Sequence, residues 1–146
     1  MNEVTVESDG YLKQKITAGN HVLTADEPIS SGGQDSGPDP YSLLLASLGA
    51  CTSMTIQMYA HRKGFPLEKV IVRLTHERIY AKDCEECESK EGVVGRIERH
   101  ITVRGALTEE QKAKLLEIAG KCPVGKTLTS ELLIKDFLAT GDPACL

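Results

Sequence analysis

The sequence has no tryptophan, no internal repeat, no low-complexity tract and no excess of positive charge. Its first ten residues, MNEVTVESDG, contain neither the basic nor the apolar region of a signal peptide. The formal net charge of −4 argues against nucleic acid and anionic membranes as partners, because both attract cationic surfaces. We therefore expect a cytoplasmic protein that binds neither nucleic acid nor a membrane.

The chain is long enough, at 146 residues, for a single domain with a substantial core, and we expect one domain over 1–146. An odd number of cysteines in a reducing compartment favours working thiols or metal ligands over a disulfide framework. The sequence has five cysteines: Cys51, Cys84, Cys87, Cys122 and Cys145.

A long helix is predicted over residues 40–63, and the rest of the chain is organised around it. Asp39 is suited to cap its first turn and Gly64 to end it, which gives a length of roughly 36 Å. Apolar side chains wrap most of the way round, so we expect burial on nearly all sides. Polar residues interrupt the apolar run too often for a membrane span. Gly49 would let another element approach closely beside Cys51.

Alternation and turn signals predict the other elements. They are short strands at 4–6, 12–16 and 21–25, a loop at 26–39, strands at 67–80 and 97–103, helices at 109–119 and 123–129, and a strand at 132–138. Segregated strands and helices are typical of an α+β fold with antiparallel sheets. One small sheet can hardly bury a nearly all-apolar helix, so we expect a homodimer in which two long helices pack together. The tail GDPACL is expected to be mobile.

Cys122 is the thiol that the sequence favours most as a reactive group. It precedes Pro123 at the predicted start of a helix, where unpaired N–H groups and the helix dipole stabilise a thiolate, and Lys121 and Lys126 add positive charge. The alternative is an inert buried cysteine, which is the more usual role for a mid-helix residue such as Cys51. A reversible redox pair would need the two sulfurs within disulfide reach, and the sequence leaves that distance open.

Cys84 and Cys87 form a Cys-x-x-Cys motif in an acidic connector. His76 and His100, on the flanking strands, could complete a Cys2His2 zinc site, although the motif alone supplies only two ligands. Neighbouring glutamates disfavour thiolates and therefore a thioredoxin-type role. The alternative is an exposed connector with incidental cysteines. Cys145, in the tail, is left unassigned.

Three polar residues near the glycine-rich loop are further candidates. His21 and Asp26 bracket the strand that enters the loop, and together with Asp39 they could approach Cys51. The alternative for each is an ordinary surface polar group.

Two segments of the sequence resemble a known family. Residues 40–51, PYSLLLASLGAC, resemble the first-cysteine helix of the OsmC/Ohr family, and Cys122-Pro123-Val124 resembles its second-cysteine motif, 71 residues later. The resemblance extends from the first strand to Leu138. It implies an intertwined homodimer with two active sites at the interface, organic hydroperoxides as substrates and a role in oxidative stress defence. It also implies a peroxidatic Cys51, a resolving Cys122, an external dithiol as reductant and no bound cofactor.

The chain departs from the family pattern at two places. Tyr41-Ser42 stands where the family peroxidases have a glutamate, and no arginine precedes Arg62, although the family has one in its N-terminal strands. Such an arginine favours the thiolate and orients the peroxide. His21, Lys126 or a residue of the partner subunit could replace it. Two functions therefore stay open: a thiol-dependent peroxidase, or a non-catalytic protein whose thiols bind a metal or a small electrophile or sense redox state.

Overall fold

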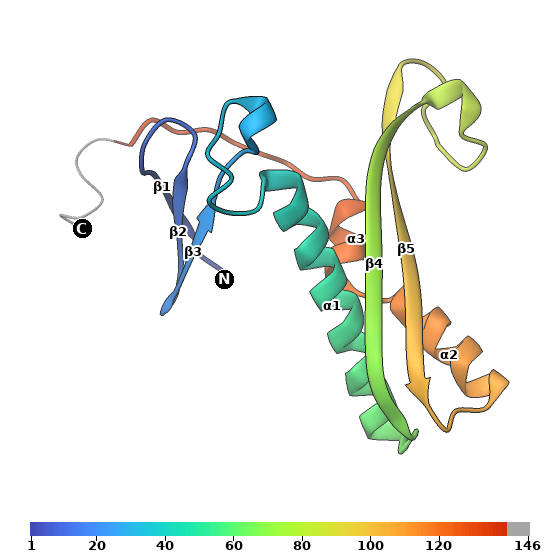
Figure 1. Cartoon of the computed structure of the whole chain (residues 1–146). Helices are drawn as coiled ribbons and strands as arrows, with labels where there is room; N and C mark the ends of the chain where they lie inside the picture. Colours follow the sequence, from blue (N-terminus) through green and yellow to red (C-terminus); the bar gives the residue numbers. More distant parts are fainter. Residues whose placement is uncertain (140–146) are drawn as a thin grey trace.

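The protein folds into two parts on either side of a long helix, α1 (Pro40–Lys63). The computed structural model describes residues 1–139. On one side of α1 lies a small antiparallel sheet in the order β1-β2-β3 (Figure 1). On the other side lies a long hairpin of two strands. The strands are β1 (Thr5–Ser8), β2 (Gln14–Ala18), β3 (His21–Ala25), β4 (Leu67–Tyr80) and β5 (Val93–Gly105), and the other helices are α2 (Glu109–Ala119) and α3 (Pro123–Leu128). The predicted α+β class with antiparallel sheets is confirmed.

Helix α1 begins and ends where the sequence predicts. The Asp39 side chain accepts the backbone N–H of Ser42, and Gly64 closes the helix in the left-handed region at φ 69°. By length and composition alone the helix could cross a membrane. In this fold it packs instead against β4, α2 and α3.

The β4–β5 hairpin presents two different faces. Val70, Val72 and Leu74 of β4 lie opposite Val103, Ile101 and Arg99 of β5 in the register of the pair. Side chains two residues apart share a face, so these positions form one surface, and the intervening positions of both strands are mostly polar or charged. The apolar surface packs against the helices, as the cluster of Val70, Ile101 and Val103 around the core shows.

The core lies between α1, α2 and the hairpin. Its buried members are Ile56 and Ala60 from α1 and Leu115 and Ala119 from α2. Helix α2 opens with the predicted capping box, in which Thr108 and Gln111 each bond the other's backbone N–H. This packing fixes the end of α2, and therefore the turn that carries Cys122.

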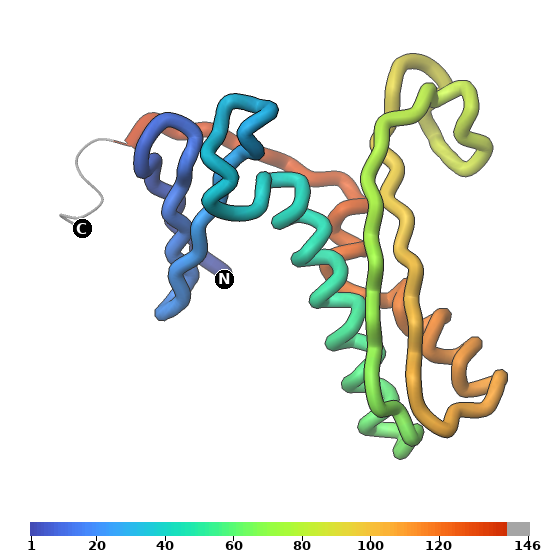
Figure 2. Tube along the Cα trace, in the orientation of Figure 1, coloured from blue at the N-terminus to red at the C-terminus, as the bar shows by residue number. Residues whose placement is uncertain are grey.

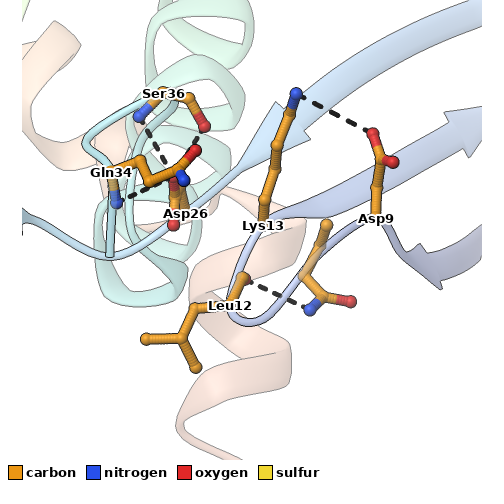
Figure 3. Close-up of polar contacts among 7 residues, drawn as sticks. Asp9, Leu12, Lys13, Asp26, Gln34 and Ser36 are labelled. Carbon is orange, nitrogen blue, oxygen red and sulfur yellow. Dashed lines mark hydrogen bonds and ion pairs between the residues drawn. The ribbon is translucent and has the colours of Figure 1, made fainter. Parts of the chain in front are cut away.

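The predicted loop between β3 and α1 is organised by one buried carboxylate. Asp26 is only 2% exposed, and its oxygens accept the backbone N–H groups of Glu27, Gln34 and Ser36 and the Ser36 hydroxyl (Figure 3). The Ser36 hydroxyl, as the largest cause, and the backbone N–H groups hold the pKa of Asp26 below its ordinary value, although burial opposes them. Asp26 is therefore a structural centre of the loop and not a surface polar group.

Two predictions about the fold are wrong for the single chain. The long helix is buried along one side only, at Leu48, Gly49, Thr52, Ile56 and Ala60, whereas Met54 and Met58 are 63% and 72% exposed. Residues 132–138 form no strand; they run back from α3 toward the small sheet without regular structure (Figure 2). A strand needs a neighbouring strand to bond, and the described chain offers this segment none. The tail GDPACL lies outside the described residues.

Candidate functional site

Cys122 lies at the start of α3, and its sulfur is wholly buried. The Gly125 N–H donates to Cys122 Sγ at 3.4 Å, and the Cys122 N–H donates to the carbonyl oxygen of Ala119 at 3.3 Å. Burial raises the pKa of the Cys122 thiol. Hydrogen bonds from the Gly125 N–H, the Cys51 and Thr52 side chains and the Val124 N–H lower it by more, so the pKa lies below its ordinary value.

The long helix places two side chains against this sulfur. Cys51 and Thr52 lie one after the other on α1, and the side chains of both are near enough to Cys122 to lower its pKa. Thr52 is fully buried, whereas Cys51 is partly exposed. Two free cysteines that lie 71 residues apart in the sequence are thus neighbours in the fold, and the one that solvent can reach is Cys51.

A cation from the hairpin reaches the same place. Arg99 of β5 donates from one nitrogen, Nη1, to Thr52 Oγ1 at 3.0 Å and to the Ala119 carbonyl oxygen at 3.2 Å. Arg99 is not among the site residues predicted from the sequence. A signal was present, because Arg99 occupies a core-facing position in the series Ile97, Ile101 and Val103, where an apolar residue is expected.

A pocket of about 350 Å³ opens beside the turn that carries Cys122. Its lining includes the two glycines that flank the Cys122 turn, apolar side chains from α1, β5 and α3, and two cationic side chains. The residues that matter here are Leu48, Ile97, Arg99, Gly125, Lys126 and Leu128. Lys126, one of the cations expected from the sequence, therefore lies at the site. The second cation is Arg99.

The other polar candidates lie elsewhere in the described chain. His21 is exposed at the end of β3 where it pairs with Ala18, in the small sheet. The carboxylate of Asp26 is occupied by its own loop. Asp39 caps α1 twelve residues before Cys51, which corresponds to about 18 Å along the helix axis. The expectation that these three residues approach Cys51 is therefore not met within one chain.

Cys84 and Cys87 form a disulfide with each other in the loop that joins β4 to β5. His76 stacks on Tyr41 with ring centroids 4.8 Å apart, and His100 hydrogen-bonds to Glu98. Within residues 1–139, no group of three or more histidine, cysteine, aspartate or glutamate side chains could hold a metal ion. The Cys2His2 arrangement is therefore wrong for this structure. Cys145 lies beyond the described residues.

Comparison with known proteins identifies the fold. A family model described as OsmC-like protein matches residues 33–135. An OsmC-like protein from Mycoplasma pneumoniae aligns with a TM-score of 0.69 at 20% identity, covering 88% of this chain and 86% of that one. The organic hydroperoxide resistance protein OsmC from Legionella pneumophila aligns with a TM-score of 0.63 at 20% identity, covering 88% and 89% of the two chains.

A third solved structure, the organic hydroperoxide resistance protein OhrB of Bacillus subtilis, aligns with a TM-score of 0.60 at 19% identity over 88% of this chain and 90% of that one. No curated protein matches the sequence. At these identities the solved structures show a shared fold. The family match covers most of the chain, and the chain therefore belongs to the OsmC-like protein family.

Proposed function

We propose that this protein is a cytoplasmic thiol-dependent peroxidase that reduces organic hydroperoxides through Cys51 and Cys122. The observation that carries the proposal is that the two free thiols are neighbours, so that the Cys51 side chain is among the groups that lower the pKa of Cys122. Two relatives of the same fold are named as organic hydroperoxide resistance proteins, which agrees with this chemistry.

The two cysteines divide the work by access and by charge. Hydroperoxide can reach the partly exposed Cys51, whereas Cys122 is buried among donors that favour its thiolate. In the proposed resting state Cys122 is the thiolate and Cys51 is the neighbouring thiol. As Cys51 attacks, its proton passes to Cys122, so the buried sulfur serves as the base for the accessible one.

The reaction balances without a bound cofactor. Cys51 sulfur attacks the terminal oxygen of ROOH, the O–O bond breaks, and the products are Cys51 sulfenic acid and the alcohol ROH. Cys122 then attacks the sulfenic sulfur, which forms the Cys51–Cys122 disulfide and releases water. An external dithiol reduces this disulfide and returns both thiols. Each turnover therefore consumes one hydroperoxide and one dithiol.

The experiment that tests the proposal is peptide mapping after oxidation. The reduced protein is treated with one equivalent of an alkyl hydroperoxide, free thiols are alkylated, and disulfides are identified by mass spectrometry. We expect a Cys51–Cys122 disulfide, its loss in Cys51→Ser, and its retention in a Cys84→Ser, Cys87→Ser double variant. Oxidation confined to Cys84 and Cys87 would refute the peroxidase.

That negative result would favour the second candidate function, a redox sensor. The observation behind it is the Cys84–Cys87 disulfide at the tip of the hairpin. Strand β4 ends at Tyr80, six residues or roughly 20 Å beyond Leu74, which lies opposite Arg99, and the disulfide follows in the loop, so it would respond independently of the thiol site. The described residues give no support to the metal-binding version of this alternative.

We also infer that the working form is a homodimer. The outer side of α1 exposes large apolar side chains, Met54 and Met58, and carries a pocket of about 590 Å³ lined by residues that include Met58, Tyr59, Ile118 and Pro123. The segment 132–138 and the small sheet also expose apolar side chains, such as Val22 and Ile134 at 61% and 82%. A second copy that packs its own α1 and N-terminal sheet against these surfaces would cover them, and it could bring its His21 to the site.

A further inference from the structure

We propose that Arg99 and Thr52 are positioning residues for Cys122: Arg99 fixes Thr52 and the Ala119 carbonyl, and the Thr52 hydroxyl follows the charge on the Cys122 sulfur. The catalytic meaning of this inference rests on the proposed peroxidase, but the geometry concerns Cys122 alone. Neither residue belongs to the two motifs by which the family resemblance was found.

Arg99 binds two of the groups that hold Cys122. One of its nitrogens donates both to Thr52 Oγ1 and to the Ala119 carbonyl oxygen, and that carbonyl also accepts the Cys122 N–H. The guanidinium therefore joins α1 to the end of α2 at the point where Cys122 begins α3. A planar group with fixed donors restrains both partners in direction as well as in distance.

The Thr52 hydroxyl has one proton to donate, and two possible acceptors lie near it. In the structure the hydroxyl donates to the Leu48 carbonyl oxygen at 2.7 Å while its oxygen accepts from Arg99. The same side chain lies near Cys122, whose pKa it lowers, and Arg99 Nη1, to which it is bonded, and Cys122 Sγ each lie 3.7 Å from the place of a Cβ at Gly125. A neutral thiol is a weak acceptor, so the Thr52 hydroxyl keeps its hydrogen bond to the Leu48 carbonyl oxygen. A thiolate is a strong acceptor, and the hydroxyl then rotates toward it.

Arg99 limits the directions in which the Thr52 hydroxyl can point. Because its N–H occupies one side of the Thr52 oxygen, the hydroxyl proton is confined to the remaining side, where Leu48 and Cys122 are the available acceptors. Thr52 is fully buried, so no solvent competes for the proton. When Cys51 passes its proton to Cys122 the hydroxyl returns to Leu48, and it turns back when Cys122 is again a thiolate and attacks the sulfenic acid.

The test is a titration of Cys122 that does not depend on peroxidase activity. Cys122 is made the sole thiol by replacing Cys51, Cys84, Cys87 and Cys145 with serine; serine at position 51 keeps a hydroxyl donor. The ultraviolet absorbance of the thiolate is then followed against pH. Thr52→Val, which is nearly isosteric, should raise the pKa of Cys122 by about one unit, because the thiolate loses one charge-assisted hydrogen bond.

The second substituted residue, Arg99, and its control, Arg96, both lie on β5. Arg99→Gln should raise the pKa of Cys122 by a similar amount, and Arg99→Lys, which keeps the charge without the planar fork, by less. Arg96→Gln is the matched control, because Arg96 lies on the opposite face of β5 and pairs with Glu77 and Glu98. It should leave the pKa of Cys122 unchanged.

Conservative variants separate positioning from simple loss of structure. Thr52→Ser retains the hydroxyl and should restore the parent pKa, which a merely structural effect of Thr52→Val would not predict. An unchanged pKa in both Thr52→Val and Arg99→Gln, or an equal rise in Thr52→Ser and Thr52→Val, would overturn the inference. If these shifts occur but oxidation mapping finds no Cys51–Cys122 disulfide, the inference stands and the proposed peroxidase fails. If the disulfide forms but the pKa of Cys122 does not shift, the proposed peroxidase stands and the inference fails.

Discussion

Helix α1 packs tightly against the hairpin at Gly49. A Cβ atom at this position would lie 2.7 Å from Leu74 Cδ1, well inside ordinary contact distance. Replacing Gly49 with alanine gains about 1 kcal/mol of helix propensity. Overpacking costs about 1–3 kcal/mol, and we take about 2 because a flexible side-chain end must move. The expected net effect of Gly49→Ala is a loss of about 1 kcal/mol in the free energy of unfolding.

The sign should reverse when the clashing atom is removed. Leu74→Val deletes both Cδ atoms, so in that background Gly49→Ala keeps its propensity gain and loses the clash. We therefore expect a stabilisation of up to about 1 kcal/mol there, and a coupling of about 2 kcal/mol between the two positions. The assay is urea denaturation of the four proteins, followed by circular dichroism at one fixed protein concentration, because dimerisation would contribute to stability.

Equal destabilisation by Gly49→Ala in both backgrounds would refute the reasoning, because the cost could not then come from contact with Leu74. Stabilisation in the parent background would show that α1 can move away from β4 without loss. Such a movement would also be expected to lengthen the bond from Arg99 to Thr52, which bridges the same two elements.

Two further predictions concern the loop and the assembly. The lowered pKa of Asp26 stabilises the fold at pH values above the ordinary pKa of an aspartate, and this contribution is lost as the pH falls through the folded-state pKa. The difference in the free energy of unfolding between the parent and Asp26→Asn should therefore shrink in acid. Denaturation at a series of pH values measures this difference. Light scattering at low micromolar concentration should give the mass of a dimer, since large apolar interfaces persist on dilution, and a monomer would mean that the outer side of α1 stays uncovered.

Local signals in the sequence were sufficient for most of the fold. Caps and stops at Asp39 and Gly64 gave the bounds of α1, and the capping box at Thr108 gave the start of α2, because each depends on a few adjacent residues. Alternation gave the core-facing side of the hairpin for the same reason. The strand expected at residues 132–138 could not be judged in this way, since pairing depends on a neighbour that the sequence does not specify.

The site was predicted less completely, because its parts come from four elements. The cysteines were found through their motifs, and Lys126 through its nearness to Cys122. Arg99 and Thr52 were missed, because the search for a cation followed the family position in the N-terminal strands. A buried threonine in an apolar helix and an arginine on the apolar side of a strand are each costly unless hydrogen-bonded, and here they bond to each other and to the carbonyl oxygens of Leu48 and Ala119.

The exposure of the two cysteines explains why the two ways of ranking the thiols disagree. Helix position favoured Cys122 as the reactive thiol, and the resemblance favoured Cys51 as the peroxidatic one. Nucleophilic attack needs access, whereas charge needs donors, and the structure separates these properties: Cys51 is partly exposed and Cys122 is buried among N–H and hydroxyl donors. In the proposed peroxidase, the negative charge that the donors stabilise on Cys122 reaches Cys51 through one proton transfer between the neighbouring thiols. An arginine beside Cys51 is then not required by this proposal, because Arg99 can serve the pair by acting on the buried thiol.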